Sequence, residues 1–303
     1  MIDVIAYLTE LENNRSEIQT GIHCVLREGY NRYTYAIGFI SVFSLMYFLI
    51  NKIVYKITDN KYIYELCVQK VQEKSKNKKI ISESTQKEIV YQLWFYRFSW
   101  MECISCLFLW PILIYVLFSF NSFHNKIFTY VDWSNYIIKT MIIGHYIVDI
   151  IEVVSNNYVK RSRDLLLHHI VVSLCFLYHL TSLLNYPWIT TLLFMEFNSF
   201  FNRFNLIQKF HDPEKTGIVF NLSNIFNFIT MIFVRFVTII FMFMYTYLYQ
   251  DLIPAYYFYF RLILLCLFTM IYLACQSFKY MIFADLKFLK LFLSGSKHIK
   301  KHA

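Results

Sequence analysis

The chain has 303 residues and a formal net charge of +9; 57% of its residues are hydrophobic and only 16% are charged. A soluble domain carries about 25% charged residues, so this composition excludes an ordinary soluble domain. With 6 Gly and 4 Pro, long apolar runs continue without turn signals, and the 31 Phe and 25 Tyr suit a lipid-facing surface. We therefore predict a single all-α membrane domain.

Apolar runs long enough to cross a bilayer recur along the sequence. The first covers residues 33–50, and a lysine-rich stretch, 51–88, follows it as a predicted basic cytosolic loop. About 20 apolar residues cross the hydrocarbon core, which predicts about seven transmembrane helices. An N-terminal segment lying on the membrane would leave six. The other predicted spans are 91–118, 136–154, 165–184, 188–207, 218–249 and 253–281.

The distribution of lysine and arginine predicts the orientation of these spans. Basic residues gather after the first, third, fifth and last spans and are scarce after the second, fourth and sixth. Cytosolic segments carry the excess of basic residues, so the C-terminus is predicted to be cytosolic and residues 1–32 luminal. A glycosylation sequon at Asn14 agrees with a luminal N-terminus.

The basic tail, residues 291–303, ends with lysines at the third and fourth positions from the end, Lys301 and Lys300. This ending resembles the dilysine retrieval signal of endoplasmic-reticulum membrane proteins, which is read from the cytosol. We therefore expect a multi-pass protein of the endoplasmic reticulum. Attraction of the tail to anionic lipid is the alternative explanation of its charge.

Cys103 and Cys106 form a C-x-x-C inside an apolar helical run, with no second cysteine pair nearby. A zinc or redox site needs water access and further ligands. We interpret these cysteines as small buried residues and expect no metal.

Ionisable residues inside the predicted spans are the candidate functional residues, because each costs on the order of 2.5–3.5 kcal/mol at mid-membrane. In the third span, His145 and Asp149 are four residues apart and share a helix face. Asp164 and His168 have the same spacing at the start of the fourth span. His169 projects about 100° away from His168, so one imidazole can face a cavity while the other bonds to a neighbouring helix.

Further polar residues lie in the fifth and sixth spans. Glu196, Ser199 and Arg203 share one helix face, and Asn198 and Asn202 share an adjacent one. Intramembrane amides commonly join helices to each other, and we interpret the asparagines and Arg235 mainly in that way.

For the histidines and carboxylates we favour a functional role. An imidazole can take a proton near neutral pH, and a carboxylate can orient it. Metal ligation is less favoured, because histidines at adjacent positions splay apart.

The polar motifs resemble those of the TLC-domain family over roughly residues 88–290. The landmarks are Tyr146-x-x-Asp149, then Asp164-x-x-x-His168-His169, then Met195-Glu196-x-Asn198-Ser199. The resemblance implies a TLC domain over residues 89–290, with a six-helix bundle around a lipid cavity and one outer helix. It also implies that Tyr146, Asp149, His179, Asn198, Ser199 and Asn202 line the cavity.

Ceramide synthases, one branch of this family, carry two aspartates in an Asp-x-x-Asp arrangement. The positions of this chain that resemble these aspartates are Glu196 and Ser199. The second carboxylate is therefore missing, and the pattern is more similar to the TLC-domain-containing branch. We predict a protein that binds lipid or regulates membrane lipid composition, with no cofactor. Its expected partners are membrane lipids and, as an option, a second copy of the chain, and neither nucleic acid nor metal.

Two alternatives stay open. The first is a ceramide-synthase-type N-acyltransferase with acyl-CoA as co-substrate. There, His168 or His169 would be the general base, and Asp164 and Glu196 the supporting carboxylates. The second is a translocon-associated or trafficking protein that uses its basic tail.

The predicted topology can be tested with epitope tags. After permeabilisation of the plasma membrane alone, a C-terminal tag should bind antibody and a tag near Met1 should not, because only the basic end faces the cytosol. A protected C-terminal tag would contradict the seven-span arrangement. Lys300→Ser with Lys301→Ser should release part of the protein from the endoplasmic reticulum.

Overall fold

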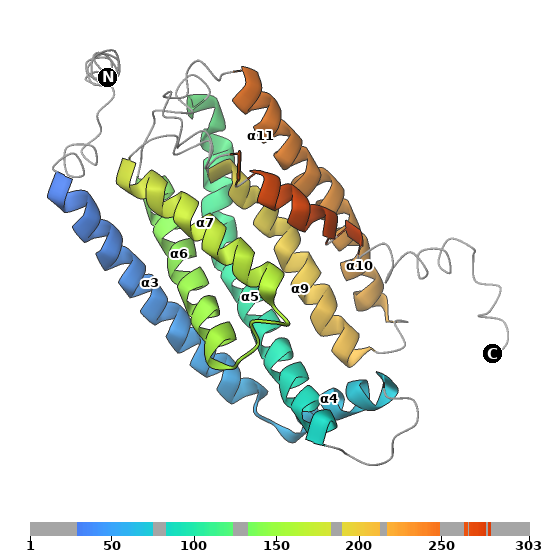
Figure 1. The fold of residues 1–303 in the computed structure, drawn as a ribbon. Coiled ribbons are helices and arrows are strands. Elements are labelled where there is room, and N and C mark those ends of the chain that lie inside the picture. The colour runs from blue at the N-terminus through green and yellow to red at the C-terminus, as the bar shows by residue number, and fades with distance from the viewer. Residues whose placement is uncertain are drawn as a thin grey trace, which may run out of the picture. The chain divides into compact units, whose positions relative to one another are not determined.

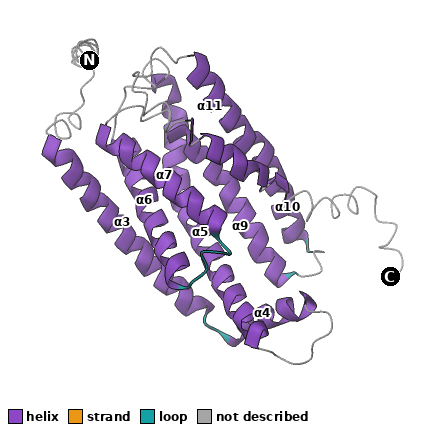
Figure 2. Ribbon diagram, in the orientation of Figure 1, coloured by secondary structure: helices purple, strands orange, loops and turns teal. Residues whose placement is uncertain are grey.

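The structure, a computed structural model, describes residues 29–74, 83–123, 133–182, 190–212, 217–248, 264–265, 267–276 and 278–279. Every secondary-structure element in these ranges is a helix (Figure 2). The predicted all-α class is confirmed. The Asn14 sequon and the tail lysines Lys300 and Lys301 lie outside the described residues.

The helices follow one another with short connections where the connections are described (Figure 1). Helical runs over Tyr33–Thr58, Arg163–Thr181 and Ile218–Leu248 are long and apolar enough to cross a membrane. The full count of seven spans stays a prediction. The elements are α3 (Gly29–Thr58), α4 (Lys61–Lys74), α5 (Glu83–Phe123), α6 (Trp133–Ser155), α7 (Arg163–Ser182), the 3-10 turn η2 (Leu192–Phe194), α9 (Met195–His211), α10 (Ile218–Thr230), the π-helical segment η3 (Met231–Phe236) and α11 (Val237–Leu248).

The stretch 51–88, predicted as a basic loop, is largely helical where it is described. Helix α3 continues to Thr58, α4 follows, and α5 begins at Glu83. The physical reason lies in three apolar residues of α4, Ile63, Cys67 and Val71, which recur every four residues and form one buried face. The many lysines of the stretch obscure this short amphipathic pattern in the sequence.

The described residues fall into two compact units. Unit 1 is drawn from Met1–Leu49, Leu109–Leu193 and Tyr245–Ile263, and unit 2 from Ile50–Phe108, Phe194–Met244 and Leu264–Ala303. Unit 1 contains α6 and α7, and unit 2 contains α4, α9 and α10. Each unit has its own packing and is described separately.

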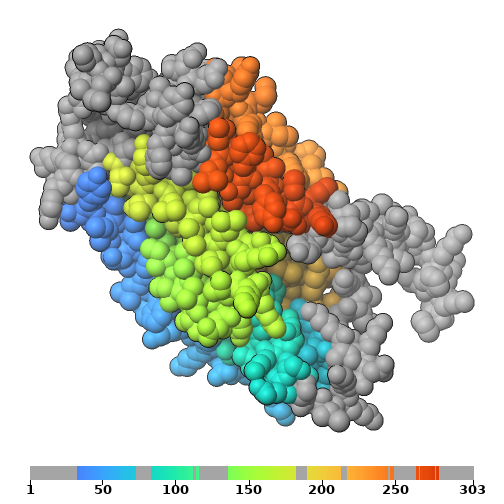
Figure 3. Space-filling view, viewed as in Figure 1, coloured from blue at the N-terminus to red at the C-terminus, as the bar shows by residue number. Residues whose placement is uncertain are grey.

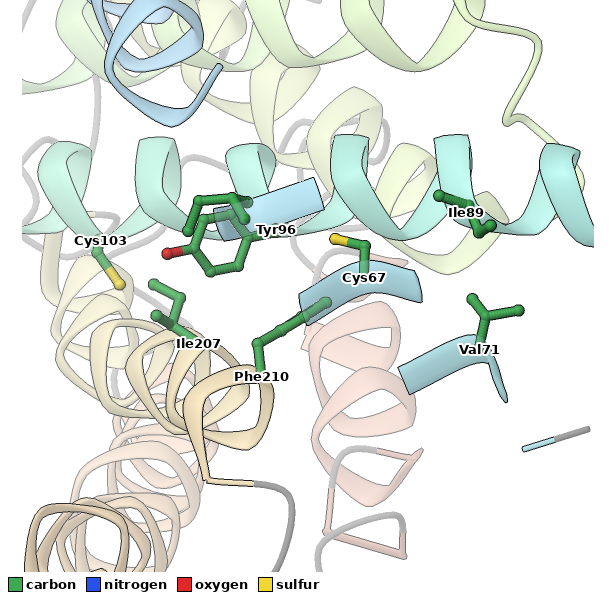
Figure 4. Close-up of a cluster of buried hydrophobic side chains, with 8 residues drawn as sticks. Cys67, Val71, Ile89, Tyr96, Cys103, Ile207 and Phe210 are labelled. Carbon is green, nitrogen blue, oxygen red and sulfur yellow. The ribbon is translucent and has the colours of Figure 1, made fainter. Parts of the chain in front are cut away.

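The core of unit 2 joins α4 to the first half of α5 and to α9 (Figure 4). Burial raises the pKa of the Cys67 thiol to about 11, so this cysteine is a small apolar core residue at neutral pH. Cys103 and Cys106 are also buried and unbonded to each other, as predicted. The cluster consists of Ile63, Cys67, Val71, Ile89, Tyr96, Cys103, Ile207 and Phe210.

A hydrogen-bonded imidazole at the end of α9 adds to this packing. The Tyr96 hydroxyl lies 2.9 Å from His211 Nε2, and the Tyr62 ring of α4 stacks on the same imidazole with ring centroids 6.0 Å apart. Desolvation lowers the pKa of His211, which favours the neutral ring that can accept the tyrosine proton. The contact fastens α4 and α5 to the end of α9.

Amide side chains connect α9 to α10 within the same unit. The Asn198 amide nitrogen lies 3.1 Å from Asn227 Oδ1 and 3.0 Å from Thr230 Oγ1. Two turns further along α9, the Asn205 amide nitrogen donates to Asn224 Oδ1 at 3.1 Å. These contacts are of the helix-joining kind that polar side chains make inside membranes.

In unit 1, α6 and α7 form a helical hairpin and lie side by side (Figure 1). The Tyr158 N–H donates to the Val153 carbonyl at 2.9 Å, and the Asn157 N–H to the Val154 carbonyl at 3.0 Å. This pair of bonds is the Schellman pattern of a helix C-terminus. Asn157 has a φ of 58°, the left-handed conformation that the pattern requires. The turn therefore fixes where α7 begins relative to α6.

Helix α3 approaches α6 very closely at Gly144. A Cβ atom there would lie 2.9 Å from both Phe43 Cβ and the Ser44 backbone nitrogen. The Ser44 hydroxyl donates to the Gly144 carbonyl at 3.3 Å. Only glycine permits this separation of the two backbones, which brings α3 next to His145.

The turn between α6 and α7 generates a stability prediction. Asn157→Val should destabilise the protein by about 1–2 kcal/mol, because a β-branched residue is strained in the left-handed region. Asn157→Gly should unfold at the temperature of the wild type or slightly above it. Thermal unfolding of the purified protein in detergent, followed by circular dichroism, checks both. Equal stability of the valine variant would show that the turn does not depend on this conformation.

Candidate functional site in α6 and α7

The two adjacent histidines of α7 meet different side chains of α6. His169 Nδ1 lies 3.4 Å from Asp149 Oδ2, and His168 Nε2 lies 3.3 Å from the Tyr146 hydroxyl. Tyr146 and Asp149 are three residues apart and share one face of α6. The imidazoles diverge along α7, and α6 supplies one polar group for each of them.

Asp149 is shared by a second imidazole from its own helix. His145 Nε2 lies 3.3 Å from the same oxygen, Oδ2, that faces His169. The Asp149 side chain is only 3% exposed, and His145 and His169 are similarly buried. A carboxylate enclosed in this way is stabilised when one of the two rings carries a proton, because an isolated buried charge is costly.

The Tyr146 ring restricts the motion of His169. The two rings are parallel, with an interplanar angle of 7° and centroids 4.0 Å apart. The same tyrosine meets His168 edge-on, with ring centroids 5.6 Å apart. Tyr146 therefore packs against one imidazole and hydrogen-bonds to the other.

Helix α3 contributes Tyr47, which the sequence does not single out. Its ring centroid lies 4.8 Å from that of His145, and the side chain is fully buried. Tyr47 belongs to the first apolar run, where an isolated tyrosine gives no signal, and only the close approach at Gly144 brings it here. We use the name polar cluster for Tyr47, His145, Tyr146, Asp149, His168 and His169.

The geometry of the polar cluster suits proton exchange as well as binding. His169 presents Nδ1 to the Asp149 carboxylate. Asp149 orients this ring and stabilises its protonated form, as a carboxylate does beside a general base. The cluster can thus hold a polar ligand or move a proton.

Asp164 does not pair with His168 as the four-residue spacing predicts. Its side chain is 44% exposed and lies 3.7 Å from the guanidinium of Arg163. The reason is its position in the first turn of α7, beside the basic connection to α6. Asp149, from the neighbouring helix, is the carboxylate that meets the histidines.

His179 is buried in α7, eleven residues after His168, where its ring meets Tyr178 with centroids 5.9 Å apart. Three turns of helix separate it from the polar cluster. Its predicted place in a lipid cavity stays a prediction.

The four predicted site residues of α9 belong to unit 2. Glu196 is buried, Asn202 is half-buried, and Asn198 is bonded to α10 as described above. The Ser199 hydroxyl accepts a hydrogen bond from Arg235 Nη2 at 3.0 Å, and Arg235 lies in the π-helical segment η3. A joint site of these residues with the histidines stays a prediction.

The apolar helices and the charged cluster buried among them define a multi-pass helical membrane protein. A family model described as TLC domain matches residues 87–284, and the chain belongs to the TLC-domain family. The resemblance to this family is thereby confirmed, while the match does not separate the branches of the family. Searches of curated proteins and of solved structures found no match.

The pairing of Asp149 with His169 predicts energetic coupling. In a double-mutant cycle, Asp149→Asn and His169→Gln should be non-additive, with a coupling free energy between about 0.5 and 3 kcal/mol, as for residues in contact. Asp164→Asn with His168→Gln is the matched control and should be additive within about 0.5 kcal/mol. Thermal unfolding in detergent measures both cycles. Additivity of the Asp149 and His169 changes together with coupling of the Asp164 and His168 changes would contradict this prediction. That result would support the Asp164–His168 pair that the four-residue spacing predicts.

Proposed function

We propose that this TLC-domain protein binds a membrane lipid through the polar cluster and thereby regulates membrane lipid composition in the endoplasmic reticulum. The observation that carries the proposal is the Asp149 carboxylate, buried in α6 and shared by two imidazoles. Ionisable groups at such positions in membrane helices mark ligand or ion sites by default. The dilysine-like tail supports the location.

Magnitudes separate binding from a purely helix-joining role. An aspartate at the centre of a membrane helix costs about 2.5–3.5 kcal/mol. Interhelical polar contacts in membranes contribute about 0.6 kcal/mol each on average, so the contact of Asp149 with His169 of α7 offsets less than half of that cost. The short turn already joins α6 to α7. The asparagines of α9 and α10 join those two helices with uncharged groups. Joining helices therefore does not require the charge of Asp149, and this charge supports a role in binding.

A second candidate is acyl transfer from acyl-CoA, and the contact of Asp149 with His169 favours it. A carboxylate-oriented imidazole can take the proton of an attacking amine or hydroxyl. The partner of Ser199 argues against ceramide-synthase chemistry, because this hydroxyl is bonded to Arg235 where ceramide synthases have a carboxylate. We therefore rank lipid binding above catalysis.

Lipids that co-purify with the protein test the proposal. One lipid class should be enriched with the wild type by mass spectrometry and reduced severalfold in Asp149→Asn and His169→Gln, which break the shared contact. Thr181→Val is the control, because the Thr181 hydroxyl donates to the Leu177 and Tyr178 carbonyls of its own helix and valine keeps the shape of the side chain. Thermal unfolding verifies that each variant is folded.

Identical lipid profiles in all four folded proteins would contradict lipid binding at the polar cluster. The same preparations are then incubated with acyl-CoA and a sphingoid base. An amide product formed by the wild type and the control, and lost in both cluster variants, would replace binding by acyl transfer as the assigned function.

A further inference from the structure

The junction between α3 and α4 carries exposed basic side chains, Lys52, Lys56 and Lys61, for which we use the name basic rim. We propose that the basic rim binds the headgroups of anionic phospholipids, in the leaflet that the predicted orientation makes cytosolic. The junction belongs to unit 2, and binding there is independent of lipid binding at the polar cluster. The depth of the junction, the exposure of its lysines and its excess of positive charge support this binding.

The junction lies at the level where α3 leaves the hydrocarbon core. The run 33–51, between Arg32 and Lys52, contains no charged residue, and it opens the candidate membrane span Tyr33–Thr58. At about 1.5 Å per residue this run extends about 28 Å, which matches a hydrocarbon core about 30 Å thick. Lys56 lies about 6 Å further along the helix, and the headgroup layer adds about 5–7 Å on each side. Both lysines of α3 are therefore placed within reach of lipid phosphates.

Basic and apolar side chains are neighbours on the exposed surface of the last turns of α3. Lys52 and Lys56 are exposed, and Ile53 and Ile57 beside them are 57% and 69% exposed. Residues four apart share a helix face, so the two isoleucines lie on one face and the two lysines on the next. The isoleucines can contact acyl chains while the ammonium groups of the lysines reach the phosphates, as long basic side chains do at membrane surfaces. Figure 3 shows the blue side chains of α3 at the surface of the molecule.

Helix α4 holds the third lysine of the basic rim outward. The apolar face of α4 is buried in the core of unit 2, against α5 and α9 (Figure 4). On the exposed side of α4, the Lys61 side chain is 91% exposed and Tyr62 is 58% exposed. Exposed tyrosines are typical of the level of the headgroups. Only residues 59 and 60 separate α4 from α3, so Lys61 stays close to the end of α3.

The junction has an excess of positive charge. Within residues 50–66 the acidic side chains are Asp59 and Glu65, against the three lysines of the basic rim. Asp59 lies 3.1 Å from Arg97 of α5, which adds a fourth positive charge, and Glu65 lies 3.6 Å from Lys61. Ion pairs between exposed side chains are weak, so Lys61 can exchange Glu65 for a lipid phosphate. Basic groups in this excess attract the anionic lipids of a membrane surface.

Spin-labelled lipids test this binding on the full chain, reconstituted in phosphatidylcholine membranes. Electron paramagnetic resonance measures how much spin-labelled phosphatidylserine, and how much spin-labelled phosphatidylcholine, is immobilised at the protein. Phosphatidylserine should associate with the wild type about threefold more strongly, because each lysine near the membrane surface attracts anionic lipid. This preference should shrink between about 0.1 M and about 1 M salt, because the screening length falls from about 10 Å to about 3 Å.

Variants of the basic rim locate the binding. Lys52→Gln, Lys56→Gln and Lys61→Gln together should remove most of the preference for phosphatidylserine, because they remove three positive charges. Arginine at the same three positions is the matched control and should keep the preference, because the charge is retained. A second control removes the same number of charges from the connection between α6 and α7 and should also keep it: Lys160→Gln, Arg161→Gln and Arg163→Gln. Thermal unfolding in detergent verifies that each variant is folded.

Three results would overturn the proposal. The first is equal association of the two lipids with the wild type, or a preference that the glutamine variant of the basic rim retains. The second is an equal loss of preference in the variant of the α6–α7 connection, which would assign the attraction to the net charge of the protein. The third is binding of a polyglutamate peptide that only the glutamine variant of the basic rim loses, without a lipid preference. That result would assign the basic rim to an acidic protein partner.

Discussion

The buried carboxylate of Asp149 is the constraint on which the arrangement of unit 1 depends. A charge in this position is tolerated only with partners, and two imidazoles supply them from α6 itself and from α7. The left-handed Asn157 turn sets the start of α7 so that His168 and His169 reach the level of Tyr146 and Asp149. Gly144 then admits α3 close enough for Tyr47 to cover His145.

The two units use polar groups in different ways, and the difference is chemical. In unit 2, α9 and α10 are joined by amides, which form hydrogen bonds without carrying charge. In unit 1, the polar groups between α6 and α7 can gain and lose protons. Uncharged amides are sufficient to hold membrane helices together, so the ionisable set is the one suited to respond to a ligand.

The sequence predicts helices well where apolar runs are long. It does not predict side-chain contacts between residues of different helices. The span predicted at 136–154 corresponds to α6 at Trp133–Ser155, because only a helix can cross lipid with its backbone satisfied. The spacing of Asp164 and His168 shows a shared face of one helix, but it carries no information about Asp149 on the neighbouring helix. Tyr47 and α4 were missed for the same reason: their roles are set by what packs against them.

The turn at Asn157 also bears on the order in which the membrane receives the chain. Asp149 is made before His169, twenty residues ahead of it, so α6 arrives at the membrane with a carboxylate whose second partner is still being synthesised. A short, preformed connection lets the two helices leave the insertion machinery as one hairpin. In that form the Asp149 carboxylate enters the membrane together with His169. The short sequence separation of these two residues therefore matters for membrane insertion as well as for the folded structure.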